Sequence, residues 1–276
     1  MCLITVGSVR AVTQNATFAS KIEAVRVDVL VTDEGRPVRD LQAAEFDVLD
    51  NGVRQEVDLT SFEQIPLNAV LALDMSESVA GERLDHLRGA ARGLLDGLKP
   101  DDQAALVTFN HVVFQGSGLT TGLERVRAAI DRTVATGETS LVDGVYTAMM
   151  IGESDVGRSL LIVFSDGLDT SSWLSADAVL DAAKRSDVVV YAVAVGTSPK
   201  ATFLPDLSAL TGGTFFRTES TKDLGATFLQ ILDEFRHRYL VSYSPRGVAK
   251  GGWHQLEVRV KRKGVRIKAR PGYLSN

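Results

Sequence analysis

The chain has 276 residues, of which 45% are hydrophobic, enough for a sizeable core in one large domain or two smaller ones. Its formal net charge of −5 makes the whole molecule a poor counter-charge for nucleic acid or anionic lipid. A single cysteine, Cys2, excludes an intrachain disulfide and a cysteine-built zinc site, and the sequence has no apolar run of about eighteen residues that would predict a transmembrane segment.

Residues 1–18 form a short N-terminal segment that lacks a complete secretory signal. Its apolar run, at residues 3–6, is shorter than the hydrophobic stretch of a signal peptide. A disordered tail and the remnant of a signal peptide are both open interpretations.

Residues 19–65 are predicted to be mostly β-structure. Valines recur at every second position from 25 to 31, which is the period of a half-buried strand. Two further strands, at 46–49 and 55–62, flank residues 50–52 (Asp-Asn-Gly), a sequence typical of a hairpin turn.

Strands and helices are predicted to alternate from residue 66 to residue 238. This spacing indicates a mostly parallel sheet covered on both faces, a doubly wound, Rossmann-like α/β domain. Glycines at positions 89, 93 and 97 of the first helix are predicted to pack closely against that sheet. The expected strands are 70–73, 104–109, 112–114, 159–165, 188–195 and 214–217, and the expected helices are 83–98, 122–133, 140–152, 175–186, 204–210 and 222–238.

Residues 239–276 are again predicted to be β-structure, with one strand at 240–243 and a hairpin of strands 256–261 and 265–269. Neither terminal β segment is large enough to hold a core alone. We therefore expect the two to pack together as one discontinuous β-sandwich-like module. Seven basic residues between 259 and 270 are predicted to form a solvated strand face rather than a nucleic-acid patch, because no aromatic residue is interleaved.

Oxygen-bearing side chains follow the apolar run at 70–73, at positions 74, 76 and 78 (Asp, Ser, Ser). Such donors are preferred by hard divalent cations such as Mg²⁺. A second buried strand ends just before Asp166, and Thr139 lies in a loop before a predicted helix. In open α/β sheets, ligands bind beyond the carboxyl ends of the strands, where the strand order reverses. Taken singly, these residues are also typical of turns and helix caps, and the residues at 140 and 143 are spaced as a capping pair.

Together these residues resemble the von Willebrand factor type A domain and its metal-ion-dependent adhesion site. That pattern is D-x-S-x-S, a later Thr in a Gly-containing loop, and Asp-Gly after a central strand. The resemblance covers about 66–238 and implies a non-catalytic protein-binding module. It implies a divalent cation, Mg²⁺ in the first place with Mn²⁺ or Ca²⁺ as alternatives, and a partner protein whose Asp or Glu carboxylate completes the metal shell. The matching residues are Asp74, Ser76, Ser78, Thr139 and Asp166.

Residues 35–41 and 46–52 are similar to a stretch that precedes this domain in a bacterial, secreted-type group of proteins. This resemblance implies a secreted or periplasmic protein with a role in envelope adhesion, assembly or recognition, a cytoplasmic location being the alternative. By analogy with the family, the last helix, at 222–238, is a candidate for ligand-linked movement.

Enzymatic interpretations receive little support from the sequence. No G-x-G-x-x-G or P-loop follows the first strand, and no G-x-S-x-G is present. A Mg²⁺-dependent phosphotransferase or phosphatase of Rossmann-like fold is the alternative, although its second acid would stand where Ser76 does. Glu77, Glu138 and Asp169 are predicted to be surface residues, and Trp173 either anchors a partner or packs under its loop.

Overall fold

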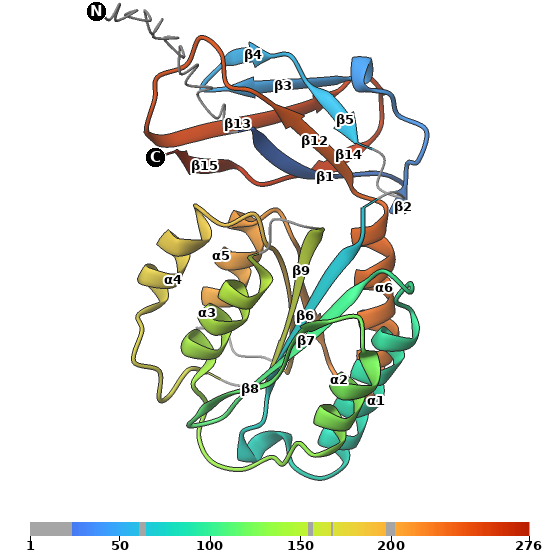
Figure 1. The fold of residues 1–276 in the computed structure, drawn as a ribbon, viewed down its shortest axis with the longest axis vertical. Helices are drawn as coiled ribbons and strands as arrows, with labels where there is room; N and C mark the ends of the chain where they lie inside the picture. Colours follow the sequence, from blue (N-terminus) through green and yellow to red (C-terminus); the bar gives the residue numbers. More distant parts are fainter. Residues whose placement is uncertain (1–23, 61–64, 154–156, 167, 197–201, 276) are drawn as a thin grey trace, which may run out of the picture.

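The computed structural model describes residues 24–60, 65–153, 157–166, 168–196 and 202–275. They form an α/β domain and a β-sandwich that lie end to end (Figure 1). The predicted N-terminal tail lies outside the described residues. None of the described helices is long and apolar enough to cross a membrane.

A six-stranded sheet in the order β11-β10-β9-β6-β7-β8 forms the centre of the α/β domain. All neighbouring strands are parallel except β7 and β8. Every residue of the two central strands is buried, since helices cover both faces. The predicted doubly wound, mostly parallel sheet is thus confirmed. The strands are β6 (Leu67–Asp74), β7 (Gln103–Phe109), β8 (Val113–Thr120), β9 (Arg158–Ser165), β10 (Val189–Val195) and β11 (Phe215–Thr218).

Helices of the described residues cover both faces of this sheet (Figure 1). Alternate strand residues point to opposite faces, so Leu71 packs in the core under α1 and α6 whereas Val70 packs under α3. One face carries α1 (Glu82–Asp96), α2 (Leu123–Asp131) and α6 (Leu224–Arg236), and the other carries α3 (Leu141–Gly152), α4 (Ala176–Ala183) and α5 (Phe203–Leu210).

The two ends of the chain share the β-sandwich. Strand β1 pairs with β12, and β3 pairs with β13, so each sheet contains strands from both terminal segments. Asn51 and Gly52 have φ of 46° and 81° in the β3–β4 turn, as a tight hairpin requires. One sheet contains β1 (Val25–Asp33), β2 (Arg36–Pro37), β5 (Asp58–Thr60), β12 (Tyr239–Tyr243) and β14 (Arg266–Lys268), and the other β3 (Phe46–Asp50), β4 (Val53–Gln55), β13 (Gly252–Val260) and β15 (Gly272–Ser275).

The hairpin predicted from 256–261 and 265–269 is wrong. Strand β13 pairs with β3 and β15, whereas β14 pairs with β1 in the opposite sheet. The alternation of residues identifies both strands, but it does not identify their partners. The predicted packing of Gly89 and Gly93 against the sheet is also wrong, since a Cβ built at either position meets nothing within 4 Å.

Arginines join the sandwich to the α/β domain. Arg158 at the start of β9 is 3% exposed, and its Nε donates to Asp28 Oδ1 at 2.8 Å. Arg238, fully buried just after α6, donates from Nη1 to the Asp28 carbonyl at 3.2 Å. Arg270 is 7% exposed and pairs with Asp187 at 3.0 Å. This last residue lies in the basic segment 259–270 and contradicts the prediction that the whole segment is a solvated face.

Candidate metal site

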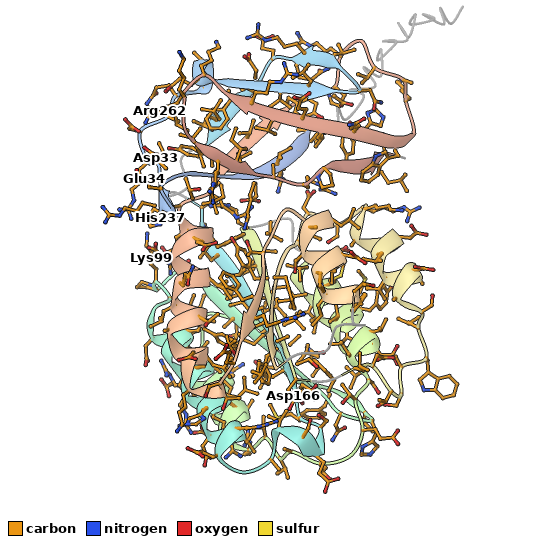
Figure 2. All side chains as sticks on the ribbon, turned by 180° about the vertical axis from the view of Figure 1, so that it is seen from behind. Asp33, Glu34, Lys99, Asp166, His237 and Arg262 are labelled. Atoms are coloured by element: carbon orange, nitrogen blue, oxygen red, sulfur yellow. The ribbon has the colours of Figure 1, made fainter. Side chains whose placement is uncertain are left out.

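The site lies where the strand order of the central sheet reverses. From β6 the chain continues to β7 on one side, and β9 lies beside β6 on the other. Asp74 is the last residue of β6, and Asp166 directly follows β9. Figure 2 shows Asp166 at the end of the α/β domain that is remote from the sandwich. Two predicted site residues are therefore brought to one crevice at the carboxyl ends of adjacent parallel strands.

Asp74 is completely buried, and both of its carboxylate oxygens are hydrogen-bonded. Its Oδ1 accepts from the Ser76 backbone N at 2.8 Å, and its Oδ2 accepts from Ser165 Oγ at 2.7 Å. Burial raises the pKa of Asp74, while the hydrogen bonds from Ser76 and Ser165 oppose that rise. The carboxylate is thus fixed in orientation and poorly solvated, which favours binding of a cation.

Ser76, Ser78 and Asp166 form a continuous chain of oxygen atoms. The two serine hydroxyls are 3.0 Å apart, and Ser78 Oγ donates to Asp166 Oδ1 at 2.6 Å. Ser76 is 3% exposed, whereas Ser78 is exposed in the middle of a short 3₁₀ turn (Glu77–Val79). The structure therefore joins residues that are 88 positions apart in the sequence.

Thr139 reaches the same region through its loop. The backbone N of Glu77 donates to the Gly137 carbonyl at 3.0 Å, which places the loop beside the Ser76–Ser78 turn. Thr139 is 6% exposed, and its backbone N donates to Thr170 Oγ1 at 3.0 Å. Among the hydrogen bonds of the described residues, none joins the Thr139 hydroxyl to the other four site residues.

Arg83 is a site residue that sequence reasoning missed. Its Nη1 donates to Asp166 Oδ2 at 2.9 Å and to the Ser78 carbonyl at 3.1 Å. The Arg83 side chain is 52% exposed, and the Asp166 side chain is 3% exposed. An arginine in the first turn of an amphipathic helix is an ordinary surface residue in the sequence, so no signal pointed to this contact.

The N-terminus of α3 is capped by a distant segment rather than by its own residues. Ser140 makes no side-chain capping bond, so the capping pair predicted at 140 and 143 is wrong. Asp143 Oδ2 accepts instead from the backbone N of Trp173 at 2.9 Å, and Val142 N donates to Asp169 Oδ1 at 3.2 Å. The predicted surface residue Asp169 thus has a structural role. Trp173 is 96% exposed, which excludes packing under its loop.

The donor set is made of two carboxylates and three hydroxyls, all hard oxygen ligands. Among the described residues no group of three or more His, Cys, Asp and Glu side chains could hold a metal, so a cation here would depend on the hydroxyls. These residues fit a divalent cation such as Mg²⁺, Mn²⁺ or Ca²⁺. Two carboxylates neutralise such an ion only formally, because the Asp166 charge is shared with Arg83. The arrangement can therefore attract a further, external carboxylate.

Comparison with protein families gives a match to the model of the von Willebrand factor type A domain over residues 68–230, more than half of the chain. Among curated proteins, the uncharacterized protein sll0103 of Synechocystis sp. is 34% identical over 85 residues, 30% of this chain and 20% of that protein. Inter-alpha-trypsin inhibitor heavy chain H2 of Mus musculus is 25% identical over 186 residues, 62% of this chain and 20% of that protein. The chain thus spans about a fifth of the length of these relatives.

Solved structures show a similar fold. A von Willebrand factor type A protein from Catenulispora acidiphila has a TM-score of 0.57 at 11% identity, over 93% of this chain and 75% of that one. Proximal thread matrix protein 1 from the mussel byssus, with a zinc-occupied MIDAS motif, has a TM-score of 0.57 at 18% identity, over 67% of this chain and 49% of that one.

Proposed function

The chain belongs to the von Willebrand factor type A domain family, and from this premise we propose that it is a divalent-cation-dependent protein-binding module. The cation supplies a Lewis-acidic docking point at the carboxyl ends of β6 and β9. No catalytic residue is assigned. The residues proposed to hold the cation are Asp74, Ser76, Ser78, Thr139 and Asp166.

The observation that carries this proposal is the hydrogen-bonded chain from Ser76 through Ser78 to Asp166, beside the buried carboxylate of Asp74. Hydroxyl and carboxylate oxygens that already lie within hydrogen-bonding distance need little reorganisation to coordinate one ion. The buried Asp74 carboxylate also gains from a positive charge nearby. The zinc-occupied motif of the mussel protein supports a divalent cation in this family.

A carboxylate of a protein partner is proposed as the external ligand. Only two of the five proposed ligands are charged, and Asp166 also pairs with Arg83, so the site as a whole keeps positive charge and coordination positions for water. An Asp or Glu side chain of a partner can replace one such water. We place this interaction outside the cytoplasm, in adhesion or assembly, because the flanking segments 35–41 and 46–52 resemble a secreted-type group.

Calorimetric titration with MgCl₂ and MnCl₂ tests the metal site directly. Asp74→Asn is expected to weaken binding by at least ~10-fold, since it removes a charged ligand. Asp96→Asn is the matched control, because Asp96 is a carboxylate in an exposed ion pair with Arg127 at the far end of α1. Equal affinities of wild type and Asp74→Asn would contradict the proposal.

The enzyme alternative makes a different prediction. A Mg²⁺-dependent phosphatase or phosphotransferase would show metal-dependent turnover of a phosphate ester that disappears in Asp74→Ala. We expect no such turnover in either protein. Metal-dependent turnover that requires Asp74 would favour the enzyme over the binding module.

A further inference from the structure

Exposed apolar side chains gather in the segment 168–174, which follows Asp166. Leu168 is 46% exposed, Trp173 is 96% exposed and Leu174 is 38% exposed. We name these three residues the apolar ridge. Single exposed leucines are ordinary on a protein surface, but three large apolar residues within seven positions beside a proposed ligand site indicate a binding surface.

Hydrogen bonds fix this segment to the loop and helix that follow Thr139. The Thr139 carbonyl accepts from the backbone N of Thr170 at 2.9 Å and of Ser171 at 3.1 Å. Asp143 Oδ1 accepts from the backbone N of Leu174 at 2.9 Å. The backbone of the ridge is therefore held in place by the elements that carry the candidate metal site.

A groove of about 490 Å³ lies between two ridge residues, Leu168 and Leu174, and α5. It opens at the carboxyl ends of β9 and β10, and most of its wall is apolar. Asp166 belongs both to this wall and to the hydrogen-bonded chain of the candidate metal site, so groove and site are continuous. The large apolar side chains of the wall include Leu141, Leu168, Leu174, Phe203, Leu204 and Phe215.

One charged residue of the groove wall offers a contact to an acidic occupant. Arg217 lines the groove, and its guanidinium is 5.6 Å from the centre of the Phe215 ring. Within the described part of the chain no carboxylate pairs with Arg217. The acidic wall residues are engaged, Asp166 with Ser78 and Arg83, and Asp169 with the start of α3. Among the described wall residues, Arg217 is thus a cation that remains available to a ligand.

We infer that the groove receives a large apolar side chain of the same partner segment whose carboxylate completes the metal site. The partner is thus an acidic segment in which a Leu, Ile, Met or Phe lies within two residues of an Asp or Glu. This inference rests on the proposed function and adds the chemical class of the partner. Residues of an extended segment advance ~3.3 Å each, so a side chain one or two positions from a metal-bound carboxylate reaches a groove that shares the Asp166 wall.

A selection of random linear peptides displayed on phage, on immobilised protein with Mg²⁺ and elution by EDTA, tests this class of partner. The eluted peptides are expected to carry an acidic residue with a large apolar residue within two positions. The affinities of the selected peptides are then measured for the wild type and for the variants Ala176→Phe and Val134→Ser. Ala176→Phe fills the groove from the first turn of α4. Val134→Ser is the control, since Val134 is 69% exposed beside a cavity of about 500 Å³ that none of the five proposed ligands lines.

Ala176→Phe is expected to weaken peptide binding by at least ~10-fold, the effect typical of blocking an apolar anchor, with Mg²⁺ affinity unchanged. Val134→Ser is expected to change neither. Normal Mg²⁺ binding with peptides that lack the apolar residue, or that bind Ala176→Phe as well as wild type, would overturn the inference and leave the proposed function standing. Absent Mg²⁺ binding would overturn the proposed function itself. A Mg²⁺-independent dimer that Ala176→Phe dissociates would show that a second copy fills the groove, and would also overturn the inference.

Discussion

Arg83 places a permanent positive charge at the edge of the candidate metal site. Its guanidinium bonds to Asp166 Oδ2, and the other oxygen of Asp166 accepts from Ser78. A divalent cation that used Asp166 would therefore share this carboxylate with an arginine. Arg83 holds Asp166 in position, which raises the affinity for the cation, but its charge also repels the cation, which lowers that affinity.

Arg83→Gln separates these effects, because glutamine retains an N–H donor and loses the charge. We expect Mg²⁺ to bind roughly two- to fivefold more tightly at low salt, as the removal of one exposed like charge predicts. The gain should vanish at high ionic strength, where exposed charges are screened. Arg92→Gln on the same helix, which loses an exposed pair with Asp131, serves as control. Weaker binding at every salt concentration would show that Arg83 acts mainly by holding Asp166.

Ser165 is expected to support Asp74 from beneath the site. Ser165→Ala removes the hydroxyl that donates to Asp74 Oδ2 at 2.7 Å and leaves a buried carboxylate oxygen without this donor. The free energy of unfolding should fall by about 1–3 kcal/mol, and the affinity for Mg²⁺ should fall by ~10-fold or more. Urea denaturation and calorimetric titration measure the two quantities. If both the free energy of unfolding and the Mg²⁺ affinity are unchanged, the hydrogen bond from Ser165 to Asp74 contributes to neither.

At the scale of elements, two glycines test how closely helices approach the sheet. A Cβ at Gly89 of α1 meets nothing within 4 Å, whereas a Cβ at Gly144 of α3 would lie 2.5 Å from Phe109 Cδ1. Gly89→Ala should raise the free energy of unfolding by about 0.5–1 kcal/mol, because alanine loses less backbone entropy in a helix. Gly144→Ala should lower it by about 1–3 kcal/mol through overpacking. Chemical denaturation of both variants checks the signs, and a destabilised Gly89→Ala would contradict the geometry of α1.

The helices and strands of this chain could be predicted from the sequence where the local pattern of apolar and polar residues identifies them. The runs at 70–73 and 160–164 are apolar throughout, so both central strands were predictable. Pairing over long distances was not predictable in this way. The prediction of a hairpin at 256–269 is wrong because β13 and β14 pair with strands of different sheets. Asp169 is exposed, as predicted, but its hydrogen bond with the Val142 N–H could not be predicted, because the two residues lie 27 positions apart.

The candidate site was predictable only through the order of its motif. Residues 74–78 suggested oxygen ligands, and adjacency of the two central strands brings Asp166 to them. Arg83 and Ser165 could not be found, since neither residue type nor spacing distinguishes a hydrogen bond to a site carboxylate from an ordinary surface or strand-end residue.

For the whole molecule, the contacts at the end of α6 bear on whether the modules move. Arg236 Nη2 donates to the Gly97 carbonyl at 2.9 Å and to Asp102 Oδ2 at 2.7 Å, which ties the end of α6 to the chain after α1. His237, at this end of the helix, lies next to the sandwich in Figure 2. Ligand-linked movement of α6 would therefore have to break these bonds, of which the one to Asp102 is half-buried, before it could change how the modules sit.

Arg158→Met tests how firmly the α/β domain and the sandwich are joined. It removes the guanidinium that binds Asp28 and leaves that carboxylate, 11% exposed, without its cation. The free energy of unfolding should fall by about 3–5 kcal/mol, as expected when one partner of a buried ion pair is lost. Arg158→Met combined with Asp28→Leu should recover much of this loss, since no unpaired charge then remains buried. Small-angle scattering of wild type with Mg²⁺, with EDTA and with a selected peptide provides the complementary readout. If the three wild-type profiles are identical and the Arg158→Met profile is expanded, the arginine contacts hold the two modules in a fixed arrangement. If the wild-type profile changes when the ligand is added, α6 transmits binding to the sandwich although the arginine contacts are present.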